Sequence, residues 1–347
     1  MKNNNNFEFD LQPNHLSQDA VVSMRTRIIA GLVAVAIVLP FLFMGDYSFM
    51  VLMAFILSVA VLETIKCAKK KYSIWLYIVT FILALAIAYW PVIYSFFKCA
   101  RGELELNGTK ILLESWRPYT GFEGLILPIS SLVVGVCALF ILVVSDASFE
   151  VRDACYMFTM IIVISLGVQS LMFLRFAPLY EYRYLEGVTA SNYFNYFDNI
   201  HSIFLLFYVV IATFFTDIGA YFVGVFFGKH KMNPRISPKK TWEGFFGGMF
   251  IAAITSFAFA FIFALCGQPL LPFLDLSHWY YMVAISIIIP PVSVLGDFVF
   301  SSIKRYYGIK DFGKLIPGHG GILDRLDSII FSCMVAALFI SLIIYWR

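Results

Sequence analysis

The sequence predicts an all-α, polytopic integral membrane protein with about nine transmembrane helices, and two observations carry this prediction. Of the 347 residues, 61% are hydrophobic and only 14% are charged. A soluble domain is nearer half apolar and a quarter charged, so the surplus of apolar residues needs lipid as its solvent. In addition, several apolar runs approach the ~20 residues that a helix needs to cross a bilayer core.

Nine apolar runs are the predicted spans. They occupy residues 28–44, 49–62, 74–97, 125–144, 156–174, 203–216, 245–266, 280–294 and 329–346. The second and sixth are short, and we expect the sixth to continue as a helix through Asp217. We expect the eighth to be broken at Pro290 and Pro291 and to resume beyond them, because proline removes a backbone donor. Such a break survives at membrane depth only where protein or a watery cavity satisfies the freed groups.

Basic residues between these runs predict the orientation of the chain, because lysine and arginine are enriched in cytoplasmic loops. Arg25 and Arg27 precede the first span and a group of lysines follows the second, so both sets are cytoplasmic if the N-terminus is inside. The same alternation places the basic loops 229–240 and 304–325 on the cytoplasmic face. The loops 98–124 and 175–199, in which acids balance bases, fall outside, as does the C-terminus.

Three features of the composition narrow the class of protein. The formal net charge of +3 is too small to indicate nucleic-acid binding. The six cysteines are scattered without a CxxC pair, which gives neither a zinc site nor a disulfide framework. The N-terminus lacks the basic start and apolar stretch of a signal peptide, and its run of asparagines is typical of a disordered tail.

The first group of candidate functional residues lies around the entry to the last apolar run. Asp297, Ser301 and Lys304 fall at helical positions i, i+4 and i+7, so they share one face. Asp324 and Asp327, at i and i+3, also share a face. Carboxylate and hydroxyl oxygens are hard ligands, the kind that Mg²⁺ takes alongside phosphate oxygens and water.

Glycines in the same segment suggest phosphate binding. Gly318, Gly320 and Gly321 leave backbone N–H groups accessible just before a helix start, where phosphate groups bind readily. His319 has two alternative roles, either contact with a phosphate or a role in the turn or in packing. Alternatively, all these charges merely flank a span in a basic loop. Acids gain nothing from that arrangement, and Asp297 would be costly in lipid unless it faced a polar interior.

A second group begins at the end of the sixth run. Asp217 shares one helical face with Gly224 and Gly228, whose small size permits close approach of another helix. The loop that follows offers donors suited to a polyphosphate, namely Ser237, Lys239 and Lys240. A basic loop attracted to anionic lipid would explain the lysines but not Asp217. A nucleotide and a lipid that meet at a membrane-walled site would explain both groups together.

The stretch from Ser301 to Asp327 resembles the C-terminal signature of the phosphatidate cytidylyltransferase (CDP-diacylglycerol synthase) family. That signature reads S-x-x-K-R, four residues, K-D-x-G, then P-x-H-G-G-x-x-D-R-x-D. Its positions here are Ser301, Lys304, Arg305, Lys310, Asp311, Gly313, Pro317, His319, Gly320, Gly321, Asp324, Arg325 and Asp327, and none is broken. Residues 228–244 also resemble the family's cytoplasmic loop, and residues 27–34 and 61–66 more weakly resemble its first spans. The Asn-rich tail and the loops 98–124 and 175–199 exceed the compact bacterial form.

The resemblance implies the reaction CTP + phosphatidate → CDP-diacylglycerol + diphosphate, with Mg²⁺, in phospholipid biosynthesis. The phosphate of phosphatidate is already an anion, so catalysis consists mainly of positioning and charge neutralisation. The expected catalytic residues are Asp297, Asp324, Asp327 and Lys304. The expected metal ligands are Asp297, Ser301, Asp324, Asp327 and Asp217, and a second, monovalent cation is implied by the resemblance alone. The expected substrate-binding residues are Ser237, Lys239, Lys240, Arg305, Lys310, His319, Gly320, Gly321 and Arg325.

The same resemblance completes the expected organisation. Residues 1–24 form a disordered tail, 25–199 form N-terminal transmembrane helices with two extracytoplasmic loops, and 200–347 form a C-terminal catalytic transmembrane region with cytoplasmic active-site loops. The expected partners are CTP, phosphatidate and membrane lipids but not nucleic acid, and a homodimer is left open. We expect the protein in the bacterial inner (plasma) membrane, with its site facing the cytoplasm.

Three alternatives remain open at this point. An ion-coupled secondary transporter would also have intramembrane acids, but it predicts paired interrupted helices in both halves of the chain. A polyprenol kinase or an archaeal-type lipid cytidylyltransferase would use CTP at a similar site. An inactive relative with a structural role is the third, and the unbroken signature argues against it.

Overall fold

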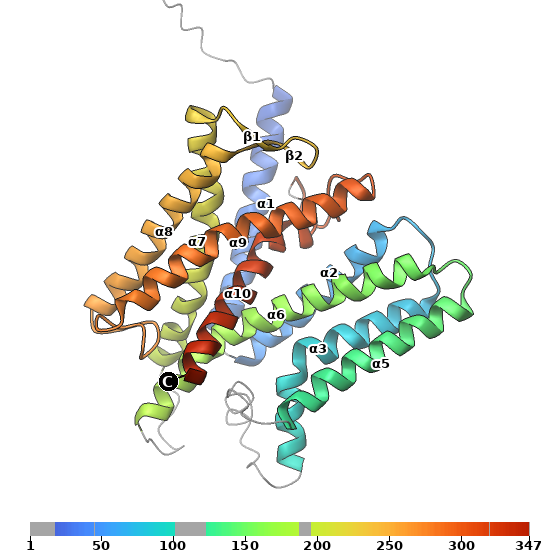
Figure 1. Cartoon of the computed structure of the whole chain (residues 1–347), viewed down its shortest axis with the longest axis horizontal. Helices are drawn as coiled ribbons and strands as arrows, with labels where there is room; N and C mark the ends of the chain where they lie inside the picture. The colour runs from blue at the N-terminus through green and yellow to red at the C-terminus, as the bar shows by residue number, and fades with distance from the viewer. Residues whose placement is uncertain (1–17, 45, 101–122, 187–195, 319, 347) are drawn as a thin grey trace, which may run out of the picture.

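The computed structural model describes residues 18–44, 46–100, 123–186, 196–318 and 320–346, and this part of the chain is almost entirely helical (Figure 1). Its elements are α1 Gln18–Phe43, α2 Asp46–Cys67, α3 Ile74–Ala100, α5 Glu123–Ser145, α6 Val151–Glu186, α7 Tyr196–Phe227, β1 Lys231–Asn233, β2 Ser237–Thr241, α8 Trp242–Leu265, α9 Trp279–Tyr306 and α10 Leu323–Trp346. Within these residues, 7 helices are long and apolar enough to cross a membrane. Shorter apolar stretches, Ile29–Phe43 and Ser130–Ser145, lie in α1 and α5. A helical, multi-pass membrane protein is therefore confirmed.

The predicted break in the eighth span is wrong, because α9 continues through Pro290 and Pro291. Each proline removes one N–H donor, yet the turns before them are held by tertiary packing. Tyr208 of α7 is fully buried, and its hydroxyl donates to the Met282 carbonyl at 2.8 Å and lies 2.8 Å from the Ser286 hydroxyl. Neighbouring helices can stabilise a proline-containing span in this way. The sixth span does continue through Asp217, as predicted.

Helix ends differ from the expected loops at two places. α1 begins at Gln18, so residues 18–24 of the predicted tail are helical, whereas residues 1–17 lie outside the described residues. α6 runs to Glu186, which shortens the predicted loop 175–199 from its N-terminal side. The remainder of both predicted long loops falls largely on residues 101–122 and 187–195, which the structure does not describe.

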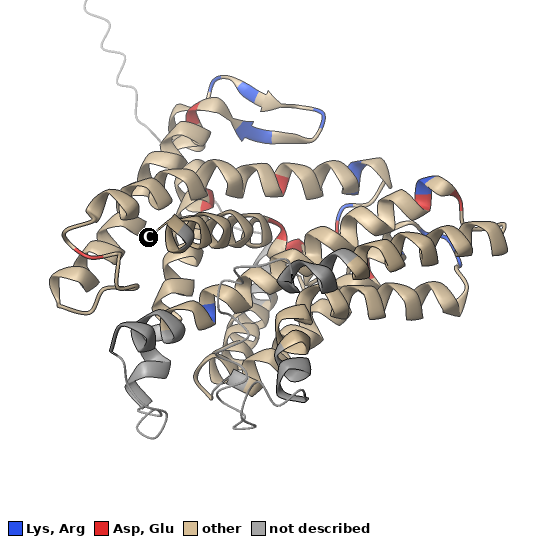
Figure 2. Cartoon of the chain, turned by 60° about the horizontal axis from the view of Figure 1, so that its bottom comes forward, with Lys and Arg blue, Asp and Glu red and all other residues tan. Residues whose placement is uncertain are grey.

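A small β-hairpin adds to the predicted all-α fold. β1 and β2 pair antiparallel and connect α7 to α8, and Figure 2 shows basic residues along the hairpin. The turn follows from its sequence. Asn233 accepts the Ile236 N–H with both its backbone oxygen and its side chain, each at 3.3 Å, and Pro234 has the fixed φ that a turn favours. The hairpin then leads into α8, whose first turn is capped by the Thr241 hydroxyl.

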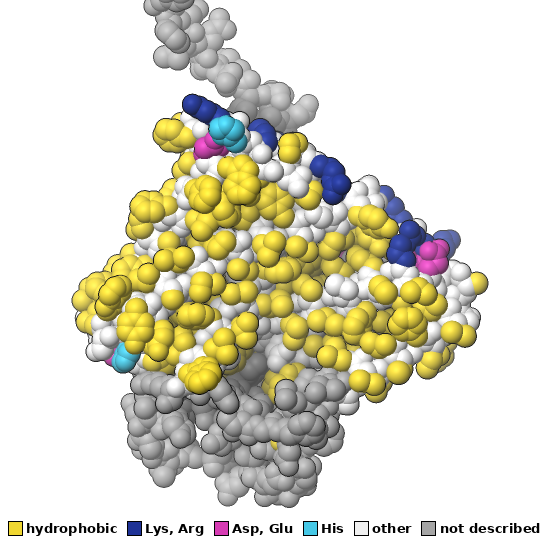
Figure 3. Space-filling view, in the orientation of Figure 1, with side chains coloured by type: hydrophobic (Ala, Val, Ile, Leu, Met, Phe, Trp, Pro, Cys, Tyr) yellow, Lys and Arg dark blue, Asp and Glu magenta, His cyan; other side chains and the backbone are white. Residues whose placement is uncertain are grey.

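The helices form a bundle in which α10 lies between α6 and α9 (Figure 1). α7 and α8 pack side by side at one edge, and α3 and α5 lie together at the opposite edge. The space-filling view in Figure 3 shows hydrophobic side chains over most of one face and lysine and arginine side chains along its upper edge. That distribution fits a lipid-facing belt with a polar rim.

Glycines allow α7 and α8 to approach closely. A Cβ at Gly248 of α8 would lie 2.6 Å from the Thr216 carbonyl oxygen and 2.8 Å from the Ala220 nitrogen, both on α7. One helical turn earlier, a Cβ at Gly244 would lie 2.6 Å from the Ala220 carbonyl oxygen. Contacts of backbone with backbone cannot be relieved by a rotamer change, so these positions admit only glycine unless the helices separate.

We therefore expect Gly248→Ala to destabilise the protein by about 1–3 kcal/mol, because the added methyl group overpacks the α7–α8 contact. Ile254→Ala is the matched control, since Ile254 is 51% exposed on the same helix and its truncation leaves that contact intact. Thermal unfolding in detergent compares the two variants. Equal losses of Tm would contradict close packing at Gly248.

Candidate active site

A buried ion pair between α9 and α10 is the centre of the candidate site. Lys304 Nζ lies 2.9 Å from Asp324 Oδ1, and the two side chains are only 11% and 2% exposed. The same ammonium is 4.0 Å from Asp327 Oδ2 and 5.6 Å from the centre of the Phe312 ring. A buried charge is tolerated only when it is paired and hydrogen-bonded. Lys304 and Asp324 therefore depend on each other for their buried positions.

The second oxygen of Asp324 organises the loop between the two helices. Asp324 Oδ2 accepts the Phe312 N–H at 2.8 Å and the Gly321 N–H at 2.9 Å, both from residues 307–322. With Lys304 on its other oxygen, Asp324 has three donors. Among the predicted metal ligands, Asp324 therefore has the fewest lone pairs left for a cation. Its role as a metal ligand stays a prediction.

Contacts from other helices hold both ends of this loop. At its start, the Tyr307 ring packs 4.8 Å from the ring of Tyr156, and Lys69 Nζ donates to the Gly308 carbonyl at 3.2 Å. Burial raises the pKa of Tyr307 to about 12, so its phenol is neutral at physiological pH. At the end of the loop, Glu63 of α2 accepts the N–H groups of Ile322 and Leu323 at 3.0 and 2.8 Å.

Sequence reasoning missed Glu63. It was noticed only within residues 61–66, as part of a weak resemblance to early spans of the family. The predicted second run ended at residue 62, one residue before Glu63, whereas α2 extends to Cys67. Within that longer helix a carboxylate is costly in lipid unless it has a polar partner, which is the argument that singled out Asp297.

A second ion pair joins the hairpin to α9. Lys240 Nζ lies 2.5 Å from Asp297 Oδ2, and the Ser301 hydroxyl donates to Asp297 Oδ1 at 3.1 Å. The Lys240 ammonium also lies 4.8 Å from the centre of the Phe298 ring. The side chains of Lys240 and Asp297 are 22% and 27% exposed, more than those of the first pair, although the Lys240 nitrogen itself is buried. The structure thus brings together Asp297, Ser301 and Lys304 on one face of α9, as predicted.

Close helix approach brings the remaining carboxylates near this pair. Gly296 lets α9 meet α10, because a Cβ there would lie 2.7 Å from the Asp327 carbonyl oxygen. Asp327 is within electrostatic range of Asp297, Lys304 and Asp217. Asp217 on α7 is exposed and within electrostatic range of Lys240 and Asp297. Four segments, α7, β2, α9 and α10, therefore converge on what we call the carboxylate–lysine cluster, which consists of Asp217, Lys240, Asp297, Ser301, Lys304, Asp324 and Asp327.

The other predicted substrate-binding residues lie around this cluster rather than in it. Lys239 on β2 is exposed and Ser237 is half-buried. Arg305, Lys310 and Arg325 are exposed at the ends of α9 and α10 and in the loop between them. His319 lies outside the described residues, so its predicted role is not addressed by the structure.

The N–H groups of Gly320 and Gly321 are not free, contrary to the prediction. The Gly320 N–H donates to the Ile316 carbonyl at 3.1 Å, and the Gly321 N–H donates to Asp324. Ile322 and Leu323 donate to Glu63. Protein acceptors thus occupy the start of α10, and the premise of accessible N–H groups at Gly320 and Gly321 needs this correction. Gly320 has φ +90°, a conformation that favours glycine, so a turn requirement explains it without any phosphate.

The donor chemistry of the cluster suits a hard cation, although the carboxylates are not drawn together into a ready-made cage. Among the residues that the structure describes, no group of three or more His, Cys, Asp or Glu side chains is arranged to hold a metal ion. Asp297 pairs with Lys240, and Asp327 Oδ1 accepts the N–H of Ser328 at 2.8 Å. Mg²⁺ usually takes only one or two protein carboxylates together with phosphate oxygens and water. Any two of Asp297, Asp327 and Asp217 would be enough for that requirement.

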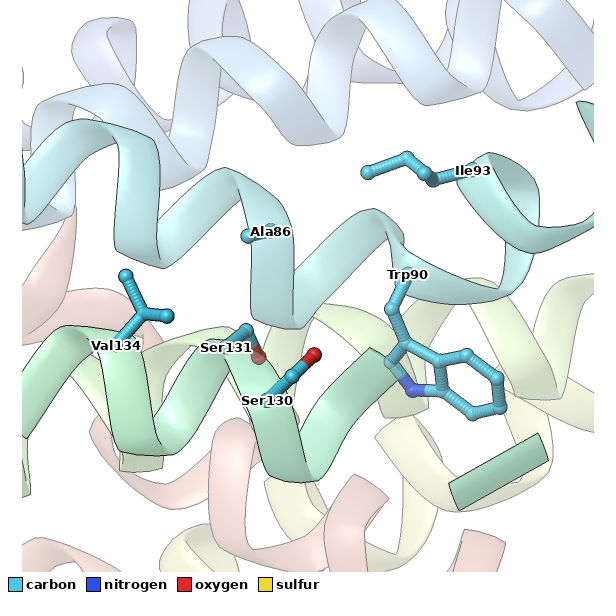
Figure 4. A pocket seen from close by; sticks show the side chains of 6 residues that line it. All are labelled: Ala86, Trp90, Ile93, Ser130, Ser131 and Val134. Atoms are coloured by element: carbon cyan, nitrogen blue, oxygen red, sulfur yellow. The ribbon is translucent and has the colours of Figure 1, made fainter. Parts of the chain in front are cut away.

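A cavity elsewhere in the bundle does not contribute to this chemistry. It measures about 260 Å³ and lies between α3 and α5, as Figure 4 shows. Its lining consists of Ala86, Trp90, Ile93, Ser130, Ser131 and Val134. None of these side chains is charged, so the cavity offers nothing to neutralise a phosphate.

The two ion pairs predict different consequences for two Asp→Asn changes. Asp324→Asn should lower the free energy of unfolding by about 3–5 kcal/mol, because it removes the hydrogen-bonded counter-charge of a buried lysine and leaves only Asp327, 4.0 Å away. Asp297→Asn should lower it less, by about 1–2 kcal/mol, because the side chains of Lys240 and Asp297 are more exposed than those of the first pair.

Thermal unfolding of both variants in the same detergent measures this difference. Similar Tm values for the two would show that Asp324 is no more important to the fold than Asp297, contrary to the arrangement described above.

Comparisons with known proteins identify the family of the chain. The chain matches the Cytidylyltransferase family over residues 25–343. It is 31% identical over 314 residues to the phosphatidate cytidylyltransferase of Bacillus subtilis (strain 168), which covers 90% of this chain and 95% of that protein. Shorter matches include the phosphatidate cytidylyltransferases of Haemophilus influenzae, 44% identical over 133 residues, and Mycobacterium bovis, 41% identical over 138 residues. These cover 38% and 40% of this chain and 44% and 42% of those proteins. Because the family match and the Bacillus relative both extend over nearly the whole sequence, the chain belongs to the cytidylyltransferase family.

Proposed function

We propose that this chain is a phosphatidate cytidylyltransferase, which forms CDP-diacylglycerol and diphosphate from CTP and phosphatidate in phospholipid biosynthesis. The observation that carries the proposal is the convergence of the carboxylate–lysine cluster from four segments of a chain whose full-length relative has that named activity. A site with one buried and one half-buried lysine beside carboxylates suits a nucleotide and a lipid phosphate that must meet.

The reaction requires one anion to attack another. An oxygen of the phosphatidate phosphate forms a bond to the α-phosphorus of CTP, and the bond from that phosphorus to the oxygen that bridges to the β-phosphate breaks. The electron pair leaves with diphosphate. No proton has to be removed from an ionised phosphate oxygen, so positioning and charge neutralisation dominate the catalysis.

The lysines of the cluster are placed for neutralisation. Lys304 is fixed by Asp324, so its ammonium can oppose negative charge without first reorganising. Lys240 is held on a hairpin and in a more open pair, which suits a group that exchanges Asp297 for a phosphate oxygen. The exposed cations around the cluster, Lys239, Arg305, Lys310 and Arg325, would attract the triphosphate and the lipid head group.

Mg²⁺ is the cofactor that we propose for this site. Asp297, Asp327 and Asp217, with Ser301, would hold it, and it would neutralise triphosphate oxygens during the displacement. Asp324 is retained as a candidate ligand, but its three hydrogen-bond donors favour a role in positioning Lys304 and the loop. A second, monovalent cation is proposed only from family resemblance.

We also propose nine spans with a cytoplasmic N-terminus. Contacts among the segments assigned to the cytoplasmic face support their placement on one common side of the membrane. Lys70 lies 2.7 Å from Asp153 and 3.3 Å from Glu150, which joins the α2–α3 connection to the start of α6. The hydrogen bond to Asp153 raises the pKa of Lys70, as expected for a pair that favours the ammonium. Lys69 reaches Gly308, so three predicted cytoplasmic segments lie at one end of the bundle.

We also propose the location of the protein and its partners. The bacterial relatives favour an inner membrane location with the site facing the cytoplasm. Membrane lipids are the expected surroundings of the apolar face, and a homodimer remains open. The transporter alternative is weakened, because α9 is continuous where that alternative predicts an interrupted helix.

Labelled nucleotide tests the reaction directly. Purified protein in detergent, supplied with phosphatidate, Mg²⁺ and α-³²P-CTP, should transfer label to the lipid extract, and EDTA should abolish the transfer. Asp297→Asn should lower the rate by at least ~100-fold, because it removes a proposed ligand of the Mg²⁺ that would neutralise the triphosphate. Asp275→Asn is the matched control, since Asp275 pairs with His278 between α8 and α9, away from the cluster.

The position of the label separates the alternatives. Transfer from γ-³²P-CTP would identify a kinase. Folded protein that transfers label from neither nucleotide would overturn the proposed activity.

Orientation can be measured by cysteine labelling in intact bacterial cells, in a cysteine-free variant. Lys71→Cys, in the exposed α2–α3 connection, should react with a membrane-impermeant maleimide only after the cells are permeabilised. Gln268→Cys, between α8 and α9, should react without permeabilisation. The reverse pattern would place the N-terminus outside.

A further inference from the structure

Glu63 of α2 is a buried carboxylate that has no role in the proposed mechanism. The residue is 5% exposed, and its two oxygens each accept one N–H from the start of α10. This arrangement suits the ionised form, since a protonated oxygen would have to donate rather than accept. In the part of the chain that the structure describes, no lysine or arginine forms an ion pair with Glu63. The N-terminus of α10, with its partial positive charge, takes that place.

Two glycines of the loop leave space for this carboxylate. A Cβ at Gly321 would lie 2.5 Å from Glu63 Oε2 and 2.6 Å from its carboxyl carbon, and the three atoms nearest to it all belong to that carboxyl group. A Cβ at Gly313 would lie 2.8 Å from the same carbon. Gly321 does not have a positive φ, so an alanine could adopt its backbone conformation. The missing side chain at Gly321 is therefore explained by Glu63 rather than by backbone geometry.

These contacts connect α2 to the carboxylate–lysine cluster. Gly321, Ile322 and Leu323 are consecutive, and the first donates to Asp324 while the other two donate to Glu63. Asp324 in turn holds Lys304. A shift of the first turn of α10 would therefore move Asp324 and its lysine together.

We infer that Glu63 is a positioning residue of the active site, which fixes the first turn of α10 and thereby places Asp324, Asp327 and Lys304. Gly321 and Gly313 admit its carboxylate. The kinetic consequence of this inference rests on the proposed function, whereas the contact between Glu63 and Gly321 does not.

The contact is tested by rescue with a conservative variant. Gly321→Ala places a methyl group against the Glu63 carboxylate and should lower both Tm and kcat. Glu63→Asp withdraws the carboxylate by one methylene, so the double variant should regain part of the lost Tm. It should also regain at least ~10-fold in kcat relative to Gly321→Ala alone, because displacement of catalytic groups by ~1 Å costs about 100-fold.

The positioning role is tested with Glu63→Gln, which keeps the size of the side chain but loses its charge and one acceptor. We expect kcat to fall ~10–100-fold, as for other groups that orient catalytic residues, with a much smaller change in KM for CTP. Ile65→Ala is the control, since Ile65 is 1% exposed on the same helix and its truncation lowers stability while Glu63 is kept. Its kcat per folded molecule should stay close to that of the unmodified protein.

Two results would overturn the inference. If Glu63→Asp leaves Gly321→Ala unimproved in both Tm and kcat, Gly321 does not accommodate Glu63. If Ile65→Ala lowers kcat as much as Glu63→Gln at equal folded protein, Glu63 is merely structural. If the Tm rescue occurs but the unmodified protein transfers no label to lipid, the contact is upheld and the proposed function is the part that fails.

Discussion

The buried pair between Lys304 and Asp324 is the constraint on which the site depends. A lysine taken out of water needs a carboxylate at hydrogen-bond distance, and that carboxylate must satisfy its remaining lone pairs. Asp324 does both, because one oxygen contacts Lys304 at 2.9 Å and the other accepts two backbone N–H groups of the loop 307–322. The loop conformation, the start of α10 and the position of the ammonium are thus parts of one arrangement, and none can change alone.

Much of the architecture could be predicted from local sequence, because a bilayer imposes a minimum length on every apolar run. The continuation of α7 through Asp217 and the shared face of Asp297, Ser301 and Lys304 followed from helical periodicity. The break at Pro290 did not occur, because the packing of Tyr208 against α9 is a tertiary contact that no local pattern reveals. The hairpin was missed for a simpler reason. Its turn residues, Asn233 and Pro234, were read as a loop and not as a turn between two strands.

The site was predictable as a set of residues but not as a set of contacts. Chemistry and spacing indicated which side chains are acids and which are cations. They could not indicate that Asp297 pairs with Lys240 from the hairpin while Asp324 pairs with Lys304, because both pairs join segments distant in sequence. The two pairs differ in how far their side chains are exposed to solvent. The open pair can exchange partners at low cost, whereas the closed pair would leave a buried charge behind.

The glycine-rich segment shows why a motif can be recognised correctly and still be misread. Glycines before a helix suggest a phosphate site, since free N–H groups at a helix start attract anions. Here the anions at the start of α10 are the protein's own carboxylates, Glu63 and Asp324, and Gly321 is small because Glu63 needs the space. An electrostatic preference that could have served a substrate is used to anchor α10 to α2. In the proposed mechanism, the lysines that this anchoring holds in place neutralise the charge of the substrate.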